Sequence, residues 1–310
     1  MYKIVVAGAG AMGGRIGVAL HQAGHNVTLI DDWEVHVQNI NNDGMKIQTE
    51  TDTYTVSIPA ILSKDVADTY DLIILLTKSM QSESMLTQLK NGGAIHENTA
   101  ILSMMNGLGH EERLSKIVPL HQIYLAVTMW SAGLKGPGHL LLEGTGSINF
   151  QCANGVNNEI SETIAHILNT ANLNATISND VFEAIWTKVT VNCVLNPLCT
   201  ILNQRIGEFG AYSKVNEMVS LIINEIVTVA HAKNIEIEAD TLLNTITAMY
   251  PDSEQGLHYP SMYQDLNNGR PTEIDFLNGQ IARYGQKFDV PTPINQMLTH
   301  QIHQLERNQL

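Results

Sequence analysis

The spacing of apolar residues changes once along the chain, near Asn179. Before this point, short apolar runs alternate with segments whose apolar residues recur every three or four positions, a pattern that predicts buried parallel strands connected by helices. After it, strand-like runs stop and helical spacing dominates. The pattern therefore predicts an α/β domain with a doubly wound sheet over residues 1–179 and an all-α domain over residues 180–310.

Short apolar runs bounded by glycine or polar residues predict the strands of the first domain. They cover residues 3–7, 27–30, 71–77, 100–105 and 175–178, and further strand-like segments fall between residues 123 and 150. Helical spacing predicts helices over residues 16–23, 158–171, 181–200, 215–229, 239–249 and 292–310, with further helix starts at 261 and 273. Gly136, Pro137 and Gly138 predict a hairpin or loop that closes the sheet.

A glycine-rich turn, GAGAMG, stands directly between the first predicted strand and the first predicted helix. Gly8 permits a tight turn, Gly10 lets the backbone approach a pyrophosphate, and Gly13 lets helix and strand pack closely. The helix N-terminus, with Ala11 and Met12, offers N–H groups and a partial positive charge to phosphates. The alternative is a glycine-rich turn that binds nothing. In this context the spacing favours a Rossmann-type dinucleotide-binding domain.

Two acids follow the second predicted strand. Asp31 stands 18 positions after Gly13, where an acid that accepts hydrogen bonds from the adenosine ribose is expected. A carboxylate there repels a 2′-phosphate, and Asp32 adds a second negative charge. No lysine or arginine lies between Arg15 and Lys46. The sequence therefore favours NAD over NADP, although either aspartate can instead begin the following turn.

Polar residues also mark two further strand ends and one helix. Lys78 and Asn106 follow predicted strands, and ligands of such sheets lie beyond the carboxyl ends of the strands; surface strand termination is the alternative. Lys188, Asn192 and Asn196 recur at every fourth position of a helix that is otherwise largely apolar. A buried lysine needs a partner or a function. The alternative is a lysine that reaches the surface beside two amides.

Composition limits the possible partners. The net charge of −14 argues against nucleic acid and anionic membranes but leaves small anionic ligands open. Three cysteines without a CxxC pair predict neither disulfides nor a zinc site, and we interpret His300 and His303 as surface residues, so no metal is expected. Without a signal-peptide pattern or a membrane-spanning run, we expect a cytoplasmic protein. Its oligomeric state stays open, with a homodimer as one option.

The chain resembles the ketopantoate reductase family of 2-oxo acid reductases over essentially its whole length. The resemblance rests on five pieces of sequence, namely residues 8–13, 77–81 (TKSMQ), 105–107 (MNG), 186–188 (WTK) with 191–198 (VNCVLNPL), and Ser261-Met262 with 272–275 (TEID). It implies an N-terminal Rossmann-type domain, an all-helical C-terminal domain and a site in the cleft between them.

The resemblance also implies roles for individual residues. Lys188 matches the catalytic lysine, the general acid that protonates the carbonyl oxygen as hydride arrives, and Glu273 matches a glutamate near it. Residues that match those holding the substrate or orienting the lysine are Asn106, Asn192, Asn196 and Ser261. Lys78 matches a lysine near the cofactor, and Asn106 is also expected to contact the cofactor.

One departure from the family pattern concerns the cofactor. Members that use NADPH commonly have an arginine just after the second strand, where this chain has Asp31 and Asp32. The chain therefore resembles the NAD-dependent D-2-hydroxy acid dehydrogenase branch, of the D-mandelate dehydrogenase kind. We expect an NAD-dependent enzyme that interconverts bulky or branched 2-oxo acids and D-2-hydroxy acids. The alternatives are an NADPH-dependent 2-dehydropantoate 2-reductase of pantothenate biosynthesis and a non-catalytic NAD-binding sensor.

Overall fold

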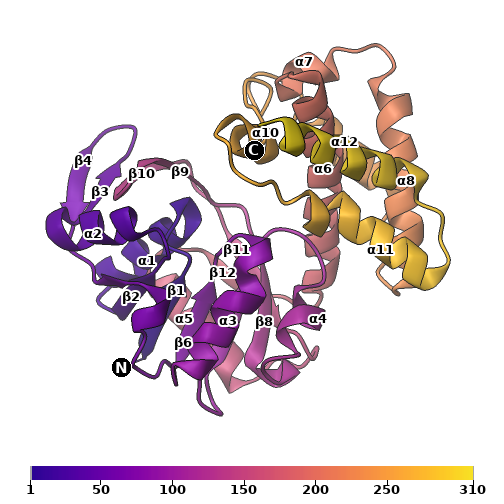
Figure 1. Ribbon diagram of the computed structural model, residues 1–310. Helices are drawn as coiled ribbons and strands as arrows, with labels where there is room; N and C mark the ends of the chain where they lie inside the picture. The colour runs from indigo at the N-terminus through magenta and orange to yellow at the C-terminus, as the bar shows by residue number, and fades with distance from the viewer. Residues whose placement is uncertain (1, 310) are drawn as a thin grey trace. The chain divides into compact units, whose positions relative to one another are not determined.

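The computed structural model describes residues 2–309, and the chain forms two compact units. Unit 1 comprises Met1–Met105 and His110–Val181, and unit 2 comprises Asn106–Gly109 and Phe182–Leu310. Each unit encloses its own hydrophobic core. In Figure 1 the sheets belong to the indigo-to-magenta part of the chain, whereas the orange-to-yellow part is helical.

One short segment differs from the predicted domain division. Asn106–Gly109 was expected in the first domain but belongs to unit 2. Leu108 N–H donates a hydrogen bond to the Phe276 carbonyl oxygen over 3.0 Å. Gly107 has a φ of +96°, and a Cβ there would lie 2.6 Å from the same carbonyl oxygen. The segment therefore packs against the chain around Phe276. No local sequence pattern predicts this contact.

The main sheet of unit 1 has the strand order β12-β11-β8-β7-β6-β1-β2-β5. The strands from β8 to β5 are parallel, and β11 pairs antiparallel with β8. The strand bounds are β1 (Lys3–Ala7), β2 (Asn26–Ile30), β5 (Ala60–Ile61), β6 (Leu72–Leu75), β7 (Ala100–Ser103), β8 (Ile123–Thr128), β11 (Ile148–Cys152) and β12 (Ala175–Ile177). The predicted Rossmann-type doubly wound fold is confirmed.

A second sheet in unit 1 has the order β4-β3-β10-β9. Its strands are β3 (Met45–Gln48), β4 (Thr53–Val56), β9 (Ser131–Gly136) and β10 (His139–Glu143). The predicted Gly-Pro-Gly hairpin connects β9 and β10, but it does not close the main sheet, because β10 pairs in parallel with β3.

Helices complete unit 1 (Figure 1). They are α1 (Ala11–Gln22), α2 (Glu34–Asp43), α3 (Ser82–Asn91), α4 (His110–Leu114) and α5 (Glu159–Thr170), with short 3-10 helices η1 (Ser63–Asp65), η2 (Ser79–Gln81) and η3 (Leu120–Gln122). α5 begins where Asn158 predicts it, because the Asn158 side chain accepts hydrogen bonds from the N–H groups of Ile160 and Ser161.

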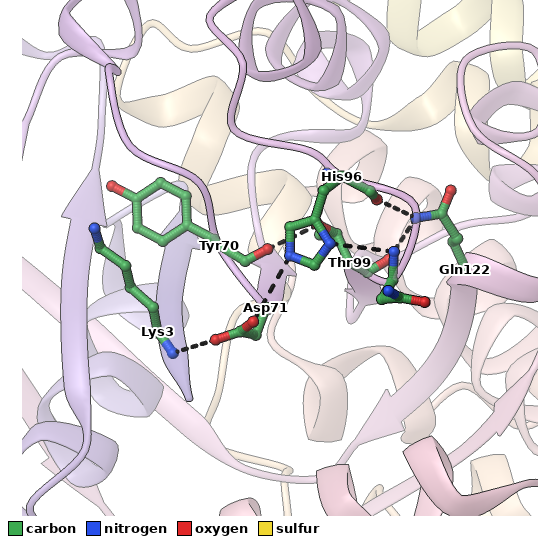
Figure 2. Close-up of polar contacts among 7 residues, drawn as sticks. Lys3, Tyr70, Asp71, His96, Thr99 and Gln122 are labelled. Atoms are coloured by element: carbon green, nitrogen blue, oxygen red, sulfur yellow. Dashed lines mark hydrogen bonds and ion pairs between the residues drawn. The ribbon is translucent and has the colours of Figure 1, made fainter. Parts of the chain in front are cut away.

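A polar network joins the segments that lead into the parallel strands (Figure 2). The Asp71 carboxylate accepts a hydrogen bond from Lys3 N–H over 2.8 Å and lies 3.7 Å from His96 Nε2. The Gln122 amide donates to the carbonyl oxygens of His96 and Thr99, each over 2.8 Å. These residues are at the amino ends of β1, β6, β7 and β8. These polar contacts therefore link the amino ends of the parallel strands. The carboxyl ends of the strands remain the candidate ligand-binding edge.

Unit 2 is helical, as predicted. Its elements are α6 (Val181–Leu202), α7 (Ile206–Gly210), α8 (Val215–Ala232), α9 (Ala239–Thr247), α10 (Ser261–Asn267), η4 (Ile274–Phe276), α11 (Asn278–Phe288) and α12 (Pro293–Gln309). The helix expected to start at Glu273 starts at Asn278, because Leu277 has non-helical angles of φ −108° and ψ −108°. The predicted last helix ended at Leu310, which lies outside the described residues.

α6 is the central element of unit 2. Its Trp186, Cys193 and Cys199 side chains are fully buried in the helical core. Within the part of the chain that the structure describes, α6 is the helix whose length and composition would suffice to cross a membrane, yet 61% of the relevant window is buried inside the protein. Such burial is typical of the core helix of a soluble protein.

Candidate active site

The glycine turn after β1 is closed on one side and open on the other. Gly8 has a φ of +95°, and a Cβ at this position would lie 2.5 Å from the Thr77 nitrogen, so only glycine fits. A Cβ at Gly13 would overlap the Gly8 carbonyl oxygen. At Gly10, in contrast, a Cβ would meet nothing within 4 Å. The turn therefore packs tightly against the end of β6 and leaves open space at Gly10.

The N-terminus of α1 suits an anion. Gly10 is the N-cap residue and supplies no side-chain hydrogen bond, and the first turn, with Ala11 and Met12, contains no acid. The first N–H groups of a helix have no intrahelical acceptor, and the helix dipole favours negative charge there. The open face at Gly10 and these N–H groups together fit the pyrophosphate of a dinucleotide.

His36 supports the glycine turn, and sequence reasoning missed it. Its Nε2 lies 2.9 Å from the Ala9 carbonyl oxygen, and Gly138 N–H donates to its Nδ1 over 2.8 Å. Since Nδ1 accepts, the proton of the neutral ring is on Nε2. His36 thus ties the glycine turn to the β9–β10 hairpin. Its partners are 27 and 102 positions away, so no local signal could have revealed the link.

The two acids after β2 have different surroundings. Asp32 Oδ1 accepts hydrogen bonds from the Ser63 N–H at 3.2 Å and from its hydroxyl at 2.5 Å, so Asp32 holds the start of η1. Asp31 Oδ1 accepts a hydrogen bond from Trp33 N–H over 3.0 Å. The Trp33 ring is 43% exposed and stacks on His36, with ring centroids 5.2 Å apart. Asp31 is therefore the stronger candidate for a ribose contact.

The two polar residues expected at strand ends fall in different units. Lys78 immediately precedes η2 in unit 1 and is partly exposed. Asn106 is the first residue of the short segment that belongs to unit 2 and is also partly exposed. The structure therefore groups Asn106 with the residues of α6.

The residues of the predicted polar face all lie within α6. Lys188 and Asn192 are partly exposed, whereas Asn196 is buried. Burial lowers the pKa of Lys188 to about 8, and the negative charge of Glu273, which directly precedes η4, acts in the opposite direction. The structure therefore brings Lys188 and Glu273 together within unit 2. Ser261, the first residue of α10, is exposed.

A lysine with a pKa near neutrality can both hold and release a proton, as a general acid requires. Unit 1 offers a turn that fits a dinucleotide, and unit 2 offers a lysine whose lowered pKa suits a proton donor. A Rossmann-type domain followed by a helical unit with a titrating lysine defines the class of NAD(P)-dependent oxidoreductases that act on a CH–OH group.

Comparison with known proteins identifies the family. Residues 4–155 match the family described as "Ketopantoate reductase PanE/ApbA", and residues 180–306 match "Ketopantoate reductase PanE/ApbA C terminal". The chain belongs to the ketopantoate reductase family. The resemblance noted in the sequence is therefore confirmed.

Individual relatives cover nearly the whole chain. A 2-dehydropantoate 2-reductase of Lactococcus lactis subsp. lactis (strain IL1403) is 39% identical over 307 residues, 98% of each chain. A 2-dehydropantoate 2-reductase of Pyrococcus horikoshii is 30% identical over 303 residues, covering 96% of this chain and 95% of the relative. The ternary structure of D-mandelate dehydrogenase with NADH and anilino(oxo)acetate is 41% identical, covers 99% of each chain and has a TM-score of 0.95.

These relatives correct the expected function. The prediction of an NAD-dependent D-2-hydroxy acid dehydrogenase of the D-mandelate kind is wrong as the main assignment, because the full-length curated relatives are 2-dehydropantoate 2-reductases. The error has a physical reason. Asp31 and Asp32 affect the choice of cofactor and do not indicate which 2-oxo acid side chain is accepted. A few residues within a shared fold determine that substrate preference.

Proposed function

We propose that the protein is a 2-dehydropantoate 2-reductase, which reduces the keto group of 2-dehydropantoate to the hydroxyl group of pantoate. The observation that carries the proposal is the Lys188–Glu273 pair on the polar face of α6, in a chain whose full-length relatives have this activity. The sensor alternative loses support for the same reason, since a sensor needs no proton donor.

Each polar residue then has a chemical task. When bound at the glycine turn, the dinucleotide would supply the hydride. The Lys188 ammonium stabilises the negative charge that develops on the carbonyl oxygen and donates its proton to that oxygen. Glu273 raises the pKa of Lys188 against the effect of burial, which keeps more of the lysine protonated. The amides and hydroxyl proposed to bind the polar groups of the substrate are those of Asn106, Asn192, Asn196 and Ser261.

We infer further that the dinucleotide is NADH. Asp31 would accept hydrogen bonds from the adenosine ribose and repel a 2′-phosphate, while Asp32 adds negative charge nearby. The turn residues Gly8, Gly10, Ala11, Met12 and Gly13 would hold the pyrophosphate, with Lys78 and Asn106 as further contacts. A D-mandelate dehydrogenase that is 40% identical binds NADH, which supports the same choice here.

We place this activity in the cytoplasm. The cysteines Cys152, Cys193 and Cys199 are buried free thiols, as suits a reducing compartment. Homodimer formation and the lack of nucleic acid or membrane partners stay predictions.

The test is kcat/KM of the purified protein for 2-dehydropantoate with NADH and with NADPH, beside phenylglyoxylate and 2-oxo-4-methylpentanoate. We expect 2-dehydropantoate to be the best of the three acids. If Glu273 or an asparagine binds its hydroxyl group, the analogues should be poorer by as much as ~10⁴-fold, because buried polar groups are then left unpaired. No turnover of 2-dehydropantoate with either cofactor would overturn the proposal.

A further inference from the structure

Pro197 lies inside α6, five positions before its last residue. Proline has no N–H, so the carbonyl group four positions earlier loses its partner in the helix, and the proline ring crowds that carbonyl. The residue four positions earlier is Cys193, which is fully buried. A buried carbonyl needs a hydrogen-bond donor from elsewhere.

Asn278 supplies that donor. Its side-chain amide donates to the Cys193 carbonyl oxygen over 2.9 Å. Asn278 is the first residue of α11 and is itself fully buried. An amide from a second helix therefore replaces the N–H that Pro197 lacks. The same amide nitrogen donates to Asn295 Oδ1 over 3.0 Å, which orients the Asn278 side chain.

Asn295 is held in turn by Glu225 of α8. The Asn295 side-chain amide donates to Glu225 Oε2 over 2.7 Å. The backbone N–H groups of Ile294 and Asn295 donate to the same carboxylate over 2.9 and 3.0 Å. Glu225 thus caps the N-terminus of α12 with its negative charge, a favourable position in the helix dipole. A chain of hydrogen bonds runs from α8 through α12 and α11 to α6.

We propose that Glu225, Asn295 and Asn278 form a positioning relay for the polar face of α6. The break in the helix ladder falls between Asn192 and Asn196, so the relay sets the part of the helix with Lys188 and Asn192 relative to the part with Asn196. The consequence for turnover rests on the proposed function. A residue with an N–H at position 197 would satisfy Cys193 without help, so the relay is needed only because the ladder is interrupted here.

The test combines Asn278→Leu, Pro197→Ala and the double variant, measured by calorimetry and steady-state kinetics. Asn278→Leu should lower the Tm by roughly 3–8 °C, because it orphans a buried carbonyl. It should also lower kcat by about tenfold or more, because small misplacements of reacting groups are costly, with the KM for NADH nearly unchanged. Adding Pro197→Ala should restore most of the Tm, because the alanine supplies an N–H that can donate to the Cys193 carbonyl oxygen, but it should not restore kcat.

Pro197→Ala alone keeps the proposal testable if Asn278→Leu does not fold. It should keep or raise the Tm and still lower kcat. Asn169→Ala is the matched control, because its amide bridges the backbone of Ala175 in unit 1 over 2.9 and 2.7 Å. This control should lower the Tm and leave kcat unchanged.

Two results would overturn the proposal. If the double variant regains kcat together with the Tm, the relay is only structural. If the Tm effects of the two substitutions add without coupling, Asn278 does not serve the Cys193 carbonyl. Turnover is measured with 2-dehydropantoate or, should that acid fail, with the best 2-oxo acid of the panel. The coupling between the Tm changes of the two substitutions is measured without substrate. Failure of the proposed function can therefore be distinguished from failure of the relay.

Discussion

At the scale of the residue, Lys188 is a titratable group whose acid–base chemistry departs clearly from its behaviour in water. Burial disfavours the ammonium, and Glu273 only partly compensates, so the pKa settles at about 8. At neutral pH the lysine is still mostly protonated, but the proton is held less tightly than in an exposed lysine. Perturbed groups of this kind concentrate at functional sites.

Removal of this amine should abolish most of the catalysis. We expect Lys188→Ala to lower kcat by about 10²–10⁴-fold, the usual contribution of a positioned acid, with little change in NADH affinity. Steady-state kinetics and NADH fluorescence titration measure the two effects. Lys287→Ala, which also removes one lysine charge but on α11, serves as the control. Near wild-type turnover in Lys188→Ala would end the assignment.

The pH dependence of reduction should report the same group. The protonated lysine is the active form, so kcat for reduction should fall as the pH rises through about 8, whereas oxidation of the hydroxy acid should accelerate. Since Glu273 raises the pKa of Lys188, Glu273→Gln should move the fall in kcat to lower pH. The measurement is a kcat profile across neutral and alkaline pH. A profile that Glu273→Gln leaves in place would show that this charge does not act on the proton donor.

The preference for NADH over NADPH is also expected to depend on a single residue, Asp31. Asp31→Asn removes the negative charge of the residue proposed to repel a 2′-phosphate but leaves the link from Asp32 to Ser63 intact. The ratio of kcat/KM for NADH to that for NADPH should fall by roughly tenfold or more, as expected for loss of one repulsion. Asp43→Asn, the same change at the exposed end of α2, should leave the ratio unchanged. A wild-type preference for NADPH would contradict the cofactor inference.

At the scale of the element, the glycine turn depends on a histidine from α2. His36→Phe keeps a ring for Trp33 to stack on but removes the hydrogen bonds to Ala9 and Gly138. We expect the free energy of unfolding to fall by about 1–3 kcal/mol, because buried backbone groups lose their partner.

The same variant should raise the KM for NADH without changing kcat at saturating NADH, because the turn is loosened and the proton donor is not. Urea unfolding and steady-state kinetics provide both readouts. His25→Phe is the control, since the His25 side chain hydrogen-bonds to Thr170 at an exposed place and has no bond to Ala9 or Gly138 among those described. Equal effects of the two variants would show that His36 has no special role in the turn.

Local patterns explain what the sequence could predict. The glycine turn and the face of Lys188 and Asn192 depend on spacings of a few residues, so both were found. The strand pair β3–β4 was missed although Met45 and Ile47 are buried on either side of exposed Lys46, a clear two-residue period. The Cys193–Asn278 bond spans 85 positions and follows from packing alone, so no pattern in one sequence could have shown it.

At the scale of the whole molecule, each unit has its own hydrophobic core, so each is expected to have its own stability against unfolding. Each core draws its buried residues almost entirely from one unit. We expect calorimetry to show more than one transition, since multi-domain proteins commonly deviate from two-state unfolding. NADH at about 100 times its Kd should stabilise the transition of unit 1 by about 2.7 kcal/mol.

Variants distinguish the units in this experiment. Lys188→Ala should keep the stabilisation by NADH, and Asp31→Asn should reduce it. A single two-state transition that NADH shifts as a whole would contradict the expectation.

The short segment Asn106–Gly109 has a consequence for dividing the gene. The chain passes from one unit to the other after Met105, after Gly109 and after Val181. A fragment that ends at Val181 would encode Leu108 without its acceptor at Phe276, and the remaining fragment would contain Phe276 without Leu108. Each half therefore contains only one partner of this hydrogen bond. Separately translated halves should have to reassemble before either is complete, which makes position 181 a natural place for a split reporter and a poor place for expressing one unit alone.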